Sequence, residues 1–155
     1  MSSDKTIDNF HLLGEQLEKL EIGSAGQRDD DGSITAIPEE EGFIFYGPYL
    51  TLPPGPYSVR MIFAAESSED TMDNPGIVLE AVWGEEVIAS FRLDEASLEA
   101  GIVALPFDVP EGGAVENPRL EIRVYSRGQF PLVVTSIDVR RLTSAFRRFA
   151  EYKTA

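Results

Sequence analysis

The stretch from Phe43 to Ala65 constrains the fold more than any other part of this sequence. Its second half alternates apolar residues with other residues, the apolar ones being Tyr57, Val59, Met61 and Phe63. A period of two places these side chains on one face of a β-strand. The segment Pro53–Pro56 provides a turn between this strand and an earlier one that begins at Phe43. We therefore predict two strands here, one of which has a strongly apolar face.

Further strand patterns follow, separated by polar loops that contain glycine and proline. They cover Ile34–Ile37, Ile77–Trp83, Val87–Arg92, Ile102–Val109, Leu120–Tyr125 and Leu132–Val139. Many short strands with turn signals between them are typical of an antiparallel sandwich or barrel. No alternation of strands and helices is visible, which argues against a doubly wound α/β fold. The fold class we predict is all-β, an antiparallel two-sheet β-sandwich.

Two local features modify this pattern. Gly47-Pro48 interrupts the strand that begins at Phe43, and proline cannot donate to a β-ladder, so we expect a bulge or a bend at a sheet edge there. Leucines near helical spacing predict a helix within Leu12–Leu20, while a strand over Leu17–Ile22 fits the same residues. The segment Thr143–Lys153 predicts a short helical tail. The expected organisation is an N-terminal segment (1–22), a β-sandwich (23–142) and a helical tail (143–155).

Composition excludes several classes of function. The 155 residues suffice for one domain with its own core, and the absence of cysteine excludes disulfides, zinc–thiolate sites and cysteine nucleophiles. A net charge of −14 repels phosphate backbones and anionic lipid, so no nucleic-acid or membrane partner is expected. It also argues against a highly anionic ligand, unless a local basic patch overrides the field. No signal peptide or transmembrane segment is recognised, so the location is unknown and cytoplasmic by default.

Catalytic motifs are missing from the sequence. His11 is the single histidine, and no G-x-S-x-G nucleophile elbow accompanies it. Neither a phosphate-binding P-loop nor a G-x-G-x-x-G after a strand occurs. Paired carboxylates for glycoside hydrolysis cannot be placed from the abundance of Asp and Glu alone. We therefore expect a non-catalytic protein.

The turn and strand motifs resemble those of galactose-binding-like jelly rolls, a class that includes many carbohydrate-binding modules. They are LPPGPY (Leu52–Tyr57), LEAVWGEE (Leu79–Glu86), LEIRVY (Leu120–Tyr125) and VVTSIDV (Val133–Val139). The stretch from Gly47 to Tyr57 is also similar to accessory sandwich domains of bacterial polysaccharide enzymes. The resemblance spans about Gly42 to Leu142. It implies a jelly-roll sandwich that binds a glycan without catalysis, beside a glycan-active enzyme.

The resemblance also bears on calcium, which many sugar-binding relatives hold between a first-strand glutamate and a last-strand aspartate. The nearest matches here are Glu21 and Asp138, so calcium is the cofactor to consider and no other is implied. The run Asp29–Asp31 followed by Gly32 invites the same interpretation. It lacks the spacing of a calcium loop, and we expect a solvated loop there.

Sugar binding needs an aromatic ring against the apolar face of a pyranose, and a few polar groups that recognise hydroxyls. The candidate ligand-binding residues are Trp83, Tyr125, Phe130, Arg60, Arg123, Arg127 and Gln129. Most of them lie in or beside the loop SRGQF (Ser126–Phe130), and loops on a rigid scaffold often carry binding residues. Two alternatives stay open. A lone tryptophan is more often part of the core, and the charges at Arg60, Glu80, Glu121 and Arg123 would form surface ion pairs if their strands are neighbours.

The function we predict is that of a non-catalytic carbohydrate-binding module. Its expected ligand is a glycan, and its expected partner is a catalytic domain. The alternative is a structural or protein-interaction sandwich that forms a homodimer through an open sheet edge or the tail. That alternative uses the same fold and the basic and aromatic residues Phe146, Arg147, Arg148 and Phe149.

Overall fold

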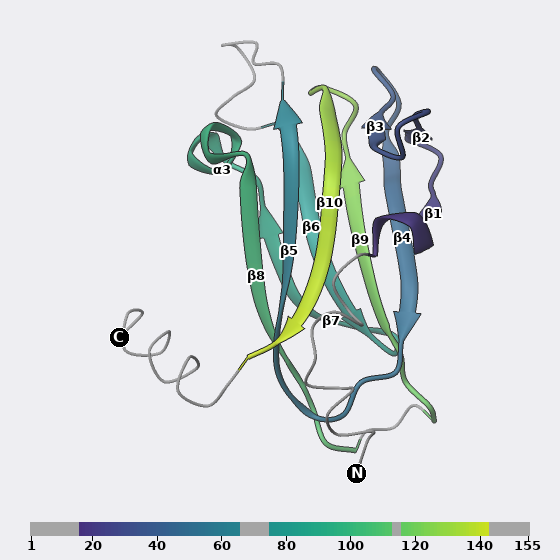
Figure 1. Cartoon of the computed structure of the whole chain (residues 1–155), viewed down its shortest axis with the longest axis vertical. Helices are drawn as coiled ribbons and strands as arrows, with labels where there is room; N and C mark the ends of the chain where they lie inside the picture. The colour runs from purple at the N-terminus through teal and green to yellow at the C-terminus, as the bar shows by residue number, and fades with distance from the viewer. Residues whose placement is uncertain (1–15, 66–74, 113–115, 143–155) are drawn as a thin grey trace.

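The computed structural model describes residues 16–65, 75–112 and 116–142 of the chain. Within these ranges, ten strands form two five-stranded antiparallel sheets that stack as a β-sandwich (Figure 1). The first sheet has the order β1 (Glu21–Ile22), β4 (Gly42–Leu50), β9 (Leu120–Ser126), β6 (Ile77–Trp83) and β7 (Glu86–Arg92). The second has the order β2 (Gly26–Arg28), β3 (Ile34–Ala36), β10 (Leu132–Arg141), β5 (Gly55–Ala65) and β8 (Ile102–Val109). The predicted all-β sandwich is confirmed.

The core lies between the two sheets and is built by alternation. In β5, the four residues of the apolar stripe, Tyr57, Val59, Met61 and Phe63, are buried as predicted. In β9, Leu120, Ile122 and Val124 are fully buried while the residues between them stay partly exposed. The rings of Tyr57 and Phe107 stack with centroids 5.8 Å apart. Each strand therefore gives one face to the core and leaves the other for solvent or a ligand.

Strand β4 corrects one expectation. Its pairing with β9 shifts register between Phe43 and Phe45 and again between Pro48 and Leu50, so the predicted irregularity is present. The strand does not lie at a sheet edge, because β1 pairs with it on the other side. That pairing involves only Phe45 and Tyr46. Pro48 therefore lies beyond the short β1 ladder, where a missing N–H does not interrupt it.

In the described part of the chain, two short helices accompany the sheets. The helix α3 (Glu95–Ala100) was not expected from the sequence. It starts with a capping box, in which the Asp94 carboxylate accepts from the Ser97 N–H and the Ser97 hydroxyl accepts from the Asp94 N–H, both at 2.9 Å. It ends at Gly101, whose φ of 71° suits glycine. Neither α3 nor the three-residue turn η1 (Leu17–Lys19) is long enough to cross a membrane.

The chain ends are only partly described. At the N-terminal side, β1 begins one residue after η1, so the expected Leu17–Ile22 strand is reduced to its last two residues. The rest of the expected N-terminal helix and the helical tail at 143–155 lie outside the described residues.

Replacing Met61 by alanine tests the assignment of the core. Met61 is fully buried, so Met61→Ala is expected to lower the free energy of unfolding by about 2–5 kcal/mol. The matched control is Ile62→Ala, one residue further along β5 on the outer face, where the side chain is half-buried and a smaller loss is expected. Urea denaturation followed by circular dichroism measures both. Equal losses for the two variants would contradict the alternation of faces.

Candidate functional site

The outer face of the first sheet carries the candidate site. Because Ile122 and Val124 of β9 point into the core, Arg123 and Tyr125 point away from it. Across the ladders, Tyr125 lies opposite Phe43 of β4 and Val78 of β6. Side chains from three neighbouring strands therefore meet on one open face.

A continuous chain of contacts runs across this face. The Tyr49 hydroxyl donates to Glu121 at 2.9 Å, and Arg123 lies 3.8 Å from Glu121. Arg123 also donates from Nε to Glu80 at 2.7 Å. Its guanidinium lies 5.0 Å from the centre of the Phe43 ring, within the range of a cation–π contact. These contacts hold Arg123 in place, so its guanidinium is already engaged.

Phe43 continues the chain of contacts to Tyr125. The two rings meet edge to face, with centroids 5.4 Å apart and an interplanar angle of 79°. The Tyr125 hydroxyl donates to the Glu41 carboxylate. This hydrogen bond, with smaller contributions from desolvation and the charge of Glu41, raises the pKa of Tyr125. The ring is thus fixed at one edge and at its hydroxyl.

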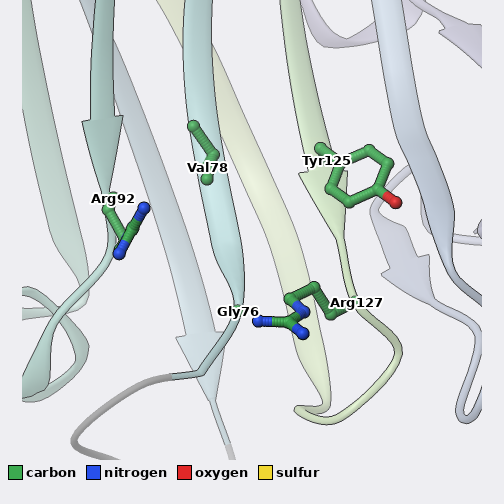
Figure 2. Close-up of a pocket in the computed structure, with 5 residues that line it drawn as sticks. All are labelled: Gly76, Val78, Arg92, Tyr125 and Arg127. Atoms are coloured by element: carbon green, nitrogen blue, oxygen red, sulfur yellow. The ribbon is translucent and has the colours of Figure 1, made fainter.

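A cavity of about 180 Å³ opens beside Tyr125. Its lining residues are Gly76, Val78, Arg92, Tyr125 and Arg127 (Figure 2). They come from the start of β6 with the residue before it, the end of β7, and the end of β9 with the residue after it. Figure 2 shows the Arg127 side chain extending from β9 across Gly76, toward the side on which Arg92 lies. The cavity thus combines an aromatic ring, a small apolar side chain and two guanidinium groups.

Gly76 determines the position of Arg127. The Arg127 N–H donates to the Gly76 carbonyl at 2.9 Å. Gly76 has a φ of +73°, and a Cβ at this position would come within 3.0 Å of the Arg127 side-chain stem. The arginine stem therefore lies directly on the backbone of Gly76, and a side chain at this position would both strain the backbone and crowd the stem.

The loop after β9 is held equally closely. Gly128 has a φ of +80°, and its carbonyl accepts from the Glu39 N–H at 3.0 Å. A Cβ at Gly128 would lie 2.9 Å from the Glu40 carbonyl oxygen. The loop Ser126–Phe130 thus packs against the Glu39–Glu41 segment, which keeps Arg127 and Glu41 on the same end of the sandwich.

The predicted site residues divide between different parts of the molecule. Tyr125, Arg123 and Arg127 come together on the outer face of the first sheet, and Gln129 is exposed in the adjoining loop. Phe130 is 3% exposed and belongs to the core, so its ring cannot contact a ligand without rearrangement. The loop Ser126–Phe130 lies at the end of β9, as predicted.

Trp83 and Arg60 lie away from this group. Trp83 pairs with Leu120 at the opposite end of β6, five residues or about 17 Å along the strand from Val78, and it packs against the core. Arg60 belongs to the second sheet and donates to Asp138 at 2.9 Å. Of the four charged residues that were expected to pair if their strands are neighbours, only Glu80, Glu121 and Arg123 lie together.

The predicted calcium pair has no support in the described residues. Glu21 is exposed on the short strand β1, whereas Asp138 is 8% exposed and lies 2.9 Å from Arg60 and 3.5 Å from Arg140. Residues 16–65, 75–112 and 116–142 contain no group of three or more His, Asp or Glu that could hold a metal ion. In the aspartate run, Asp31 accepts from the Ser33 hydroxyl at 2.6 Å, which lowers the pKa of Asp31. This is a self-contained turn rather than a calcium loop.

Phe43, Val78 and Arg92 are among the contributors that sequence reasoning missed. Each lies on a strand that was predicted, but the residue opposite it on the next strand depends on how the two strands are aligned. Arg92 lies opposite Val78, and Val78 lies opposite Tyr125. The hairpin signal between Trp83 and Val87 could not have given the first of these pairings, because the ladder shifts register between Ala81 and Val82 and a tight turn alone would pair Val78 with Phe91.

Comparison with known proteins supports the fold. No protein-family model matches the chain, and no curated protein does. Among solved structures, the chain is similar to the C-terminal CBM6 of LamC, a marine laminarinase from Zobellia galactanivorans. The TM-score is 0.55 at 14% sequence identity, and the match covers 83% of this chain and 98% of that one. The chain therefore has the fold of a carbohydrate-binding module, which confirms the predicted resemblance for the fold.

The network on the outer face predicts an unusual ionisation of Tyr49. Desolvation, the hydrogen bond to Glu121 and nearby negative charge raise its pKa to about 12. Since the folded pKa exceeds the unfolded value of about 10, stabilisation by the neutral phenol is fully present below pH 10 and is lost as the pH rises through about 12. Tyrosinate absorbance of the wild type minus that of Tyr49→Phe should give a curve centred near pH 12. A curve centred near pH 10, in protein still folded by circular dichroism, would contradict the contact.

Proposed function

We propose that this protein is a non-catalytic carbohydrate-binding domain, and that a glycan binds on the outer face of the first sheet beside Tyr125. The observation that carries the proposal is the ring of Tyr125, half-buried at the rim of a cavity on an open sheet face, in a chain with the fold of a carbohydrate-binding module. A fold hosts many functions, so the argument rests on the site.

The Tyr125 ring has the properties that a sugar platform needs. Its contact with Phe43 and its hydrogen bond to Glu41 fix its orientation before any ligand arrives. A ring held in advance loses little conformational entropy on binding. Val78 lies opposite Tyr125 on β6 and adds apolar surface to the same cavity. Together they offer an apolar wall to the C–H face of a pyranose.

Polar groups that recognise hydroxyls surround this wall. Arg92 and Arg127 line the cavity, and Gln129 is exposed in the loop that follows. Guanidinium and amide groups offer planar donors, and the amide also offers an acceptor. A cavity of about 180 Å³ is small, which favours recognition of one sugar unit or a chain end over burial of a long polysaccharide.

We further propose that the domain is accessory to a glycan-active enzyme. The solved structure it resembles is the C-terminal module of a laminarinase. The described residues of this chain gather no metal-binding cluster. The single histidine, His11, lies outside the described residues. In such a role the domain keeps a glycan close to a separate catalytic domain, which raises its effective concentration.

A second candidate function is protein interaction through the sheet edges. The edge strands β7 and β8 carry two exposed apolar side chains, Val87 at 44% and Ile102 at 38% exposure. An edge strand has unpaired backbone groups that a second copy could complete. This arrangement would give a homodimer, the alternative that the sequence left open.

Titration with a panel of neutral and acidic bacterial and algal polysaccharides tests the proposed function. We expect binding that Tyr125→Ala weakens by about tenfold or more, because the apolar wall is lost, whereas Tyr125→Phe keeps the ring and most of the affinity. The measurement is isothermal titration calorimetry.

The control is Ile62→Ala on the outer face of the second sheet, which should leave the affinity unchanged. Folded protein that binds no member of the panel would exclude the proposal.

Light scattering tests the second candidate. If a sheet edge mediates self-association, the full chain will have the mass of a dimer. Val87→Lys will shift it to a monomer, because the dimer interface would bury the lysine charge. The matched control is Thr135→Lys, exposed on β10 in the middle of the second sheet. A monomeric wild type at high concentration would rule out this candidate.

A further inference from the structure

Two arginines in the cavity have no partner within the described part of the chain. Neither the Arg92 nor the Arg127 guanidinium makes a hydrogen bond or ion pair with residues 16–65, 75–112 or 116–142. This contrasts with Arg60 and Arg123, which are engaged by carboxylates at 2.9 Å and 2.7 Å. In a chain with 27 acidic and 13 basic residues, two guanidiniums in one cavity that pair with none of the described carboxylates are unexpected.

From this we propose that the cavity binds an anionic substituent of a sugar, the carboxylate of a uronate or a sulfate ester. The inference rests on the proposed function and narrows its ligand to acidic glycans. A guanidinium presents a planar fork of donors that matches such oxygens, and charge-assisted hydrogen bonds are about twice as strong as neutral ones.

The geometry separates the anion from the sugar ring. Arg92 ends β7 and Arg127 follows β9, so the two guanidiniums approach the cavity from either side of β6 (Figure 2). Val78 and the Tyr125 ring supply the apolar surface of the same cavity. A sugar ring can rest on that surface while its anionic group lies between the arginines. Like charges repel in the empty cavity, and a bound anion relieves that repulsion.

Contacts with the backbone of Gly76 hold Arg127 in position. Its stem lies on Gly76, and its N–H donates to the Gly76 carbonyl at 2.9 Å. The arginine therefore loses less freedom on binding than a freely rotating surface side chain. Of the described carboxylates, Glu41 is the one hydrogen-bonded to a residue that lines the cavity, and the Tyr125 hydroxyl already donates to it. Among the residues that the structure describes, an incoming anion thus meets two cations without a partner and one carboxylate that is already hydrogen-bonded.

Calorimetric titration at physiological salt with three oligosaccharides of matched length tests the inference. They are an oligogalacturonide, a sulfated galactan and a neutral β-glucan. We expect at least one acidic oligosaccharide to bind about tenfold or more tightly than the neutral one, and the two acidic arms show whether carboxylate or sulfate is preferred. Arg92→Met and Arg127→Met should each lose about tenfold or more of that affinity, the value of one charge-assisted hydrogen bond.

Arg119→Met is the matched control. Arg119 is exposed at the other end of β9, its side chain has no partner among the described residues, and its loss changes the net charge by the same amount. Unchanged affinity in this variant supports a local site, while an equal loss would indicate a general charge effect and overturn the inference.

The remaining outcomes separate the inference from the proposed function. A neutral oligosaccharide that binds as tightly as the acidic ones would overturn the inference and leave the glycan-binding proposal intact. No binding by any of the three to folded protein would overturn the inference, and the broader panel then decides the proposed function. Circular dichroism and thermal melts confirm folding, and since Arg92, Arg119 and Arg127 are all exposed, little change in stability is expected.

Discussion

The burial of two apolar sheet faces against each other is the interaction on which the molecule depends. Strands β8 and β9 alternate buried and more exposed residues along their whole length. Burial of apolar surface contributes roughly 25 cal/mol for each Å² removed from water, and it requires only alternate residues. The residues between them are therefore not needed to form the core. The outer face of the first sheet can carry rings and charges because the inner face supplies the stability.

On that outer face, contacts position side chains more than they stabilise the fold. Ion pairs that remain partly exposed contribute about 0–1 kcal/mol each, so the pairs made by Arg123 add little to folding. Their effect is to hold Arg123 over the Phe43 ring, which in turn packs against Tyr125. The network orders the face as far as Tyr125 and ends there. Arg92 and Arg127 lie beyond it and are held by no carboxylate of the described residues.

The sequence was sufficient for most of the strands, because their signal is local, but the three-residue strand β2 was missed. Ile77–Trp83 and Ile102–Val109 form strands with the predicted bounds. Helix α3 was missed although Asp94, Ser97 and Gly101 are ordinary cap residues. The site was only partly predictable. Phe130 turns into the core and Trp83 lies at the far end of β6, and neither follows from a pattern of neighbours along the chain. Arg92 joins Tyr125 through β6, a register that only the folded sheet defines.

Net charge and local charge act over different distances here, and this bears on the ligand. The charge of −14 creates a repulsive field for polyanions, which slows their approach. At physiological ionic strength that field decays over about 8 Å, so within the cavity the nearest groups dominate. Two guanidiniums that have no partner in the described part of the chain then outweigh more distant carboxylates. A densely charged polymer such as a nucleic acid would meet the acidic surface along its whole length. A glycan with spaced anionic groups can place one of them between the arginines, with neutral parts of its chain against the rest of the sheet. An acidic protein with a small basic cavity thereby favours sparsely charged sugars over dense polyanions.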